Sequence, residues 1–203
     1  MRLGLFGGTF DPPHAGHLIA AQDARTILQL DTVIFIPAAI PPHKRNEGIT
    51  AAGTRLAMLR AAATEDPAFQ VDDLELHRTG PSWTVDTVRA YRERLPDAEI
   101  LLLMGSDQYA EFQSWREPDM IRELATIAVL TREGGTQEPT DGVVTARVTR
   151  IDISSTDIRR RVRAGEPIRY LVPTAVEALI RLNRLYTEPA HTEPTGPAAT
   201  GPA

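Results

Sequence analysis

The chain has 203 residues, of which 42% are hydrophobic, and it carries a formal net charge of −5. This size and composition indicate a globular protein with one sizeable core. The negative charge disfavours a broad nucleic-acid-binding surface. The absence of cysteine excludes disulfides, thiolate metal sites and a cysteine nucleophile. No apolar run is long enough to span a membrane, and the strand-like start is too short for a signal peptide, so we expect a soluble cytoplasmic protein.

A glycine turn joins the first predicted strand, residues 3–6, to a helix over residues 15–30. Gly7 and Gly8 open the turn, and His14 and His17 lie where the helix begins. Glycine lets a ligand approach the backbone closely, and the free N–H groups of a helix start favour an anion. Histidines three residues apart share one helix face and can donate hydrogen bonds to phosphate. Each feature alone is common in structural turns, but together they indicate a phosphate site.

Strands and helices alternate along the rest of the chain. The pattern predicts the following elements: strand 32–36, helix 50–64, strand 69–76, helix 84–95, strand 99–104, helix 120–124, strand 126–131, strand 143–153, helix 154–164 and helix 174–186. Such alternation is typical of a parallel sheet with right-handed crossovers. From Thr187 onward the composition is poor in large apolar residues, which predicts a folded domain over residues 1–186 and a disordered tail over 187–203.

Polar groups follow several of these strands. A proline-rich loop over residues 37–45 contains Lys44, Asp107 follows the strand at 99–104, and Arg132 follows the strand at 126–131. The carboxyl ends of parallel strands meet at the ligand-binding edge of such a sheet, so these groups are candidates for a common site. The structural alternatives are a solvated basic loop around Lys44 and a helix cap at Asp107.

Two aromatic segments have a structural and a functional interpretation. Ser82 or Thr84 can cap the helix at 84–95, or the helix start can offer backbone N–H groups to an acid group with Trp83 alongside. Trp115 can stack on a flat ring or pack against the core. The spacing of the residues leaves both alternatives open.

A second candidate phosphate site lies near the end of the predicted domain. Ser154, Ser155 and Thr156 place three hydroxyls at a helix start, which is more than capping requires, and Arg159 follows one turn later. Helical geometry spreads the remaining arginines of residues 160–163 around the helix, so we expect them to be solvated. Only Arg159 is a candidate for function.

Residues 7–18 and 153–159 resemble the paired HxGH and ISSTxxR motifs of the HxGH nucleotidyltransferase superfamily. The motifs between them are similar to those of bacterial nicotinate-nucleotide adenylyltransferases: PPHK at 41–44, GPSWT at 80–84, GSD at 105–107 and Trp115. The resemblance covers residues 1–186. It implies an α/β fold, a Rossmann-like parallel sheet with helices on both faces in a single domain. It also implies a reaction in which AMP moves from ATP to nicotinate mononucleotide, giving deamido-NAD and pyrophosphate.

The resemblance implies roles for individual residues. The implied ATP-binding residues are Gly7, Gly8, Thr9, Phe10, His14, His17, Ser154, Ser155, Thr156 and Arg159. The implied residues for nicotinate mononucleotide are Lys44, Trp83, Thr84, Asp107, Trp115 and Arg132. The implied catalytic residues are His14, His17, Lys44 and Arg159. Mg²⁺ is expected to bind mainly through ATP phosphates, with no metal ligand from the protein. We hypothesise that backbone N–H groups of residues 83–85 bind the nicotinate carboxylate.

Three alternatives are less well supported by the sequence. The first is a phosphopantetheine adenylyltransferase of the same superfamily, which would have no use for a ring pocket at residues 80–84 and Trp115. A non-catalytic nucleotide-binding module does not need both His14 and His17. A nucleic-acid partner rests on the arginines of residues 159–163 alone. Trp83 stands where tyrosine is commoner in the family, which bears on fine substrate preference. A homo-oligomer is left open.

Overall fold

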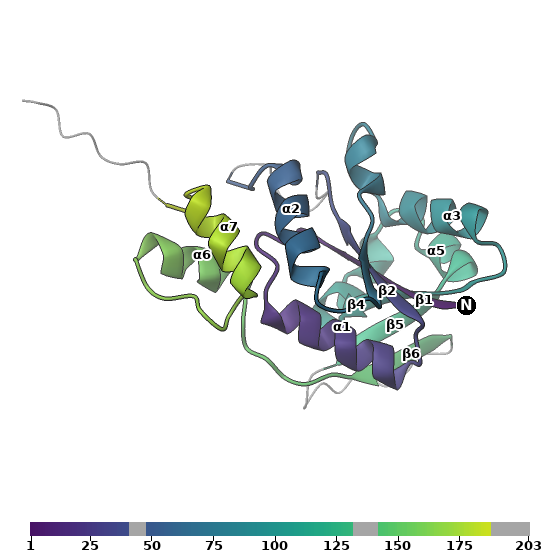
Figure 1. Cartoon of the computed structure of the whole chain (residues 1–203). Coiled ribbons are helices and arrows are strands. Elements are labelled where there is room, and N and C mark those ends of the chain that lie inside the picture. Colours follow the sequence, from purple (N-terminus) through teal and green to yellow (C-terminus); the bar gives the residue numbers. More distant parts are fainter. Residues whose placement is uncertain (41–47, 132–141, 188–203) are drawn as a thin grey trace, which may run out of the picture.

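The computed structural model describes residues 1–40, 48–131 and 142–187. Lys44, Arg132 and most of the predicted tail, residues 188–203, lie outside these ranges. The described part forms one α/β unit built on a single sheet (Figure 1). None of its helices is both long and apolar enough to cross a lipid bilayer.

The sheet has six strands, and every pair of neighbours is parallel. The strands are β1 (Arg2–Gly8), β2 (Thr32–Pro37), β3 (Phe69–Val71), β4 (Glu99–Gly105), β5 (Thr126–Thr131) and β6 (Val143–Arg147). Their order is β3-β2-β1-β4-β5-β6. This is the doubly wound arrangement in which the direction of winding reverses between β1 and β4 and opens a crevice at their carboxyl ends. The prediction of a Rossmann-like parallel sheet is therefore confirmed.

Helices cover both faces of the sheet (Figure 1). The helices are α1 (Ala15–Ile27), α2 (Ala52–Ala63), α3 (Thr84–Arg94), α4 (Ser106–Ala110), α5 (Pro118–Leu124), α6 (Ser155–Arg163) and α7 (Thr174–Leu182), with 3₁₀ turns η1 (Leu74–His77) and η2 (Phe112–Ser114). Helices α1 and α2 pack on one face, and α3 and α5 pack on the other. Helices α6 and α7 lie together at one end, where α7 packs on α2.

Alternating side chains divide the core into two layers. Along β4, Ile100 and Leu102 belong to the α3–α5 layer, whereas Leu101 and Leu103 belong to the α1–α2 layer. Successive side chains of a strand point to opposite faces, and both faces are covered here, so nearly every position must be apolar. This accounts for the continuous apolar runs that marked the strands in the sequence.

Two predicted strands are too long. The strand at 69–76 ends at Val71, because the Asp72 side chain accepts a hydrogen bond from the Leu74 backbone N–H at 2.9 Å and starts the 3₁₀ turn η1. The strand at 143–153 ends at Arg147, and the Thr149 backbone N–H donates to Asp23 of α1 at 2.6 Å. In both places a carboxylate takes a backbone donor that a longer strand would use in the sheet.

The last residues of the described chain bind the first loop. The Tyr186 hydroxyl donates to Asp11 Oδ1 at 2.6 Å, and the Thr50 backbone N–H donates to Asp11 Oδ2 at 3.1 Å. Asp11 is buried. Burial and this hydrogen bond raise the pKa of the Tyr186 phenol. The segment after α7 therefore stabilises the loop that follows β1.

We predict that Tyr186→Phe lowers the free energy of unfolding by about 1–3 kcal/mol, because the buried Asp11 carboxylate loses a donor. Urea unfolding measures the change. The matched control is Tyr170→Phe, which removes the hydroxyl of a side chain that is 86% exposed and should change stability by less than about 0.5 kcal/mol. Equal unfolding curves for the two variants would contradict the role given to Tyr186.

Candidate active site

A cavity of about 640 Å³ opens at the carboxyl ends of β1 and β4. Its position is the crevice at which doubly wound sheets bind ligands, and its size suits a small molecule. Most of the predicted site residues line it: Gly7, Gly8, Thr9, Phe10, His14, His17, Trp83, Thr84, Trp115, Ser154, Ser155, Thr156 and Arg159. Residues as far apart in the chain as Gly7 and Arg159 thus meet around one space.

One predicted residue that the structure describes, Asp107, does not line this cavity. Asp107 is exposed on α4, and its neighbour Gln108 lines the cavity instead. The Gln108 side-chain oxygen accepts a hydrogen bond from the Gly105 backbone N–H at 3.1 Å, so Gln108 also holds the start of α4. Lys44 and Arg132 lie outside the described residues.

The two histidines stack on each other at the start of α1. Their ring centroids are 3.7 Å apart with planes 24° from parallel. The backbone N–H of His14 donates to Nδ1 of His17 at 3.2 Å. A nitrogen that accepts a hydrogen bond carries no proton, so the proton of a neutral His17 is on Nε2. The edge of the Phe10 ring, with a centroid distance of 5.0 Å, supports the His17 ring from the side.

The start of α6 is joined to the loop after β1. Ser154 accepts a hydrogen bond from the Asp157 backbone N–H at 3.1 Å and so caps the helix. Ser155 donates to the Pro12 carbonyl at 2.8 Å, and Arg159 donates to the Asp11 carbonyl at 2.7 Å. Of the three hydroxyls, only that of Ser154 is used for capping. The Ser155 hydroxyl joins the start of α6 to the loop before α1, and both helix starts face the cavity.

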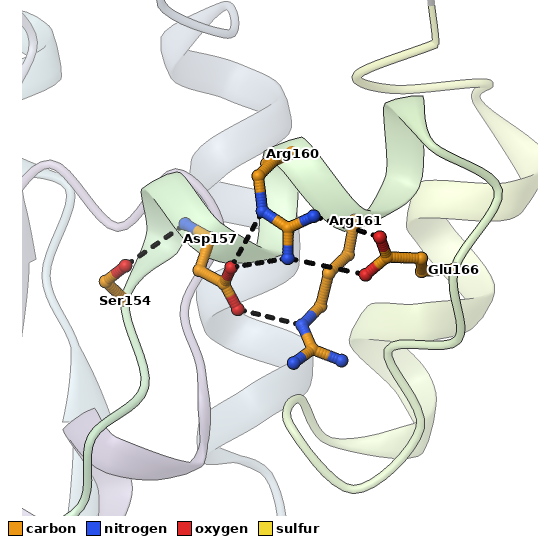
Figure 2. Close-up of polar contacts among 5 residues, drawn as sticks. All are labelled: Ser154, Asp157, Arg160, Arg161 and Glu166. Carbon is orange, nitrogen blue, oxygen red and sulfur yellow. Dashed lines mark hydrogen bonds and ion pairs between the residues drawn. The ribbon is translucent and has the colours of Figure 1, made fainter.

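Arg160 and Arg161 of α6 bind acidic side chains (Figure 2). Arg160 donates to Asp157 at 2.8 Å and to Glu166 at 2.9 Å, and Arg161 donates to the other Asp157 oxygen at 2.8 Å. Hydrogen bonds from Arg161 and Arg160 lower the pKa of the Asp157 carboxyl. Arg160 and Arg163 are exposed, as the sequence predicts, and Arg161 is half-buried. Of the four arginines in residues 159–163, Arg159 alone lines the cavity.

Arg55 is a buried residue that the sequence analysis did not identify. From α2, its guanidinium donates to the carbonyls of Thr9 at 2.7 Å, Ala38 at 2.7 Å and Thr50 at 2.8 Å. Desolvation lowers the pKa of the guanidinium, and the nearby Asp11 carboxylate opposes this. Arg55 thereby holds together the segments that follow β1 and β2. A signal existed in the sequence, because Arg55 lies on the stripe of α2 that carries the buried Met58 and Leu59.

The start of α3 has a buried acidic residue behind it. Glu75, which lines the cavity, accepts a hydrogen bond from Thr87 Oγ1 at 2.6 Å. Burial raises the pKa of the Glu75 carboxyl, and hydrogen bonds from Thr87 and Ser82 oppose the rise. Ser82 Oγ also accepts from the Ala39 backbone N–H at 2.9 Å. Neither Ser82 nor Thr84 caps α3, whose N-cap residue is Trp83 without a side-chain cap bond, so the capping prediction is wrong.

Sequence comparison with known proteins identifies the family of this chain. Residues 5–161 match the family model described as cytidylyltransferase-like. A probable nicotinate-nucleotide adenylyltransferase of Thermus thermophilus is 46% identical over 187 residues, which cover 92% of this chain and 100% of the relative. A protein of Shouchella clausii with the same description is 43% identical over 185 residues, covering 91% and 96%. The chain belongs to the nicotinate-nucleotide adenylyltransferase family. The resemblance stated from the motifs is confirmed.

Solved structures agree in fold. The Plasmodium falciparum nicotinic acid mononucleotide adenylyltransferase complexed with NaAD has a TM-score of 0.77 with 16% sequence identity, covering 91% of this chain and 97% of that chain. The same enzyme complexed with APC has a TM-score of 0.76. At this identity the comparison shows a shared architecture.

Gly16, between the two family histidines, has a steric role. A Cβ atom at this position would lie 3.1 Å from Nδ1 and 3.2 Å from Cε1 of His14, and 3.7 Å from a methyl group of Ile151. Because the His14 ring is buried against His17, it has little room to move away. The glycine of the HxGH motif thus permits the stacked arrangement of the histidines.

We predict that Gly16→Ala weakens ATP binding about tenfold, or by about 1.4 kcal/mol, because the added methyl group displaces the His14 ring. Titration calorimetry with ATP measures the change. The control is Gly53→Ala in α2, where an added Cβ meets nothing within 4 Å and ATP affinity should stay the same. Unchanged affinity in Gly16→Ala would show that the histidine stack tolerates the methyl group.

Proposed function

We propose that the cavity binds ATP and nicotinate mononucleotide together and catalyses transfer of AMP between them. The products are deamido-NAD and pyrophosphate, so the enzyme serves NAD biosynthesis. The observation that carries this proposal is the joining of two phosphate-binding helix starts, α1 and α6, at one cavity edge through Ser155 and Arg159. A chain that merely buried its loops would not need two open helix starts facing the same space.

The ATP side is formed by the two joined segments. Gly7, Gly8, Thr9 and Phe10 line the nucleotide pocket in this proposal. The phosphates take hydrogen bonds from a shared set of donors: His14, His17, Ser154, Ser155, Thr156 and Arg159. The positive ends of the α1 and α6 dipoles add to the attraction for the triphosphate.

The acceptor side is formed by aromatic residues. Trp83, Thr84 and Trp115 line the cavity, and the indole rings offer flat surfaces for a pyridine ring. Backbone N–H groups of residues 83–85 at the start of α3 are proposed to bind the nicotinate carboxylate. Roles in acceptor binding for Lys44, Asp107 and Arg132 stay predictions.

The reaction needs alignment more than it needs a base. A phosphate oxygen of nicotinate mononucleotide is already anionic at neutral pH and attacks the α-phosphorus of ATP. The new phosphorus–oxygen bond forms as the bond to the bridging oxygen of pyrophosphate breaks, so no proton has to be removed. Negative charge develops on the phosphoryl oxygens, and His14, the Nε2 proton of His17 and the Arg159 guanidinium are proposed to stabilise it.

Mg²⁺ fits this arrangement as a partner of the nucleotide. Among the described residues, no group of three or more histidine, aspartate or glutamate side chains could hold a metal ion. Mg²⁺ commonly binds through substrate phosphates and water with few protein ligands. We therefore propose that the phosphate oxygens of ATP hold it. When bound, it would neutralise phosphate charge.

The folded unit is proposed to span residues 1–186, and the hydrogen bond from Tyr186 to Asp11 supports this boundary. The cytoplasmic location, the absence of a nucleic-acid or membrane partner, the homo-oligomer and the disordered tail at 187–203 stay predictions.

Pyrophosphate release tests the proposal. The protein is incubated with ATP and Mg²⁺ and offered nicotinate mononucleotide, nicotinamide mononucleotide or phosphopantetheine in parallel. We expect the highest kcat/KM with nicotinate mononucleotide. Product from phosphopantetheine alone would make the chain a phosphopantetheine adenylyltransferase, and ATP binding with no turnover would make it a nucleotide-binding module.

We predict that His17→Ala lowers kcat by about 100-fold or more, because it removes a donor to charge that develops in the transition state. Steady-state pyrophosphate release measures the effect. His77→Ala is the control, since that imidazole is 74% exposed and outside the cavity lining, and its kcat should change less than about twofold. If both variants keep the wild-type kcat, His17 has no part in the chemical step.

A further inference from the structure

Arg116 lies at the aromatic end of the cavity with its charge held in place. Its guanidinium carbon is 5.6 Å from the centroid of the Trp83 ring, and both residues line the cavity. Its Nε is 3.4 Å from a Glu117 oxygen, and the side chain is 51% exposed. Cation–π attraction holds a guanidinium over an indole ring, and its N–H groups stay able to donate to a ligand.

The ion pair with Glu117 does not account for this arrangement. Glu117 also binds Arg89 at 3.2 Å, so one carboxylate is shared between two guanidiniums. Arg89 pairs further with Asp86 at 3.3 Å and does not line the cavity. Exposed ion pairs contribute little to stability. Arg89 thus has a second carboxylate in Asp86, whereas the ion pair of Arg116 is with the shared Glu117.

Few of the described residues that line the cavity carry a permanent positive charge. Among the described lining residues, only Arg116 and Arg159 are permanently positive. Arg159 is bonded to the loop after β1, on the proposed ATP side. The other charged groups of the lining are the acids Glu75 and Glu111, which would repel an anion bound near Trp83. Among the described residues that line the cavity, Arg116 is therefore the countercharge on offer to an anionic ligand at the aromatic end.

The chemistry of the guanidinium indicates the ligand. Its planar pair of donors matches a carboxylate, and here it stands beside a flat ring surface. We propose that Arg116 binds the carboxylate of the pyridine ring of the acceptor nucleotide and so favours the acid over the amide. This rests on the proposed function. An amide has one acceptor oxygen, presents its own N–H donors to the guanidinium and lacks the negative charge, so it would gain much less from Arg116.

The test compares the two acceptor nucleotides in variants of the two arginines. We expect Arg116→Gln to lower kcat/KM for nicotinate mononucleotide about tenfold or more, mainly through KM, while kcat/KM for nicotinamide mononucleotide and the KM for ATP change less than about twofold. Arg116→Lys keeps the charge without the planar donors and should fall between the wild type and Arg116→Gln. Arg89→Gln is the matched control, because Arg89 also pairs with Glu117 but does not line the cavity. This variant should leave kcat/KM for both acceptor nucleotides unchanged.

The outcomes separate this inference from the proposed function. Equal losses with both nucleotides would mean that Arg116 acts on a group they share, such as the phosphate, and would overturn carboxylate recognition. An unchanged preference in Arg116→Gln, or the same loss in Arg89→Gln, would also overturn it. If the wild-type protein does not use nicotinate mononucleotide, the proposed function itself fails. Melting temperatures of the three variants confirm that each is folded.

Discussion

The geometry of the site depends on the hydrogen bonds that the buried Asp11 side chain accepts. A buried carboxylate is costly unless donors surround it, and its donors come from distant segments: Thr50 before α2 and Tyr186 after α7. The carbonyl of Asp11 accepts from Arg159 of α6, and the buried Arg55 lies close enough to interact with its charge. One residue in the first loop thereby holds α6 and the segment after α7 against the cavity edge of the sheet.

The cavity has two ends of different chemical character. At one end lie two helix starts, the stacked histidines and Arg159, the donors that the proposed function assigns to the triphosphate. At the other end, Trp83, Trp115 and Arg116 offer flat surfaces and a single positive charge, with the acid Glu75 buried behind them. A reaction between a polyphosphate and a phosphorylated ring compound needs these two environments side by side. The switch point between β1 and β4 brings them within one crevice.

Errors of the sequence-based predictions share a physical cause. The strands at 69–76 and 143–153 were extended too far because β propensity continues past the points where Asp72 and Asp23 take backbone donors. Serine is a preferred helix N-cap residue, yet the Ser82 hydroxyl oxygen accepts its hydrogen bond from the Ala39 backbone N–H. In each of the last two cases, a partner more than 40 residues away in the chain competes with a local preference, and local patterns contain no record of it.

Features that depend on neighbours in the chain were predictable. Apolar runs flanked by helices require a parallel sheet covered on both faces. The glycine turn indicates a helix start at His14 and His17, and α1 begins there. Contacts across the fold were not predictable. Asp107 is exposed beside the cavity that its neighbour Gln108 lines, and Arg55, Glu75 and Arg116 gain their roles only from partners supplied by other elements. Backbone preference is local, whereas the burial and pairing of a charge depend on which surfaces the folded chain brings together.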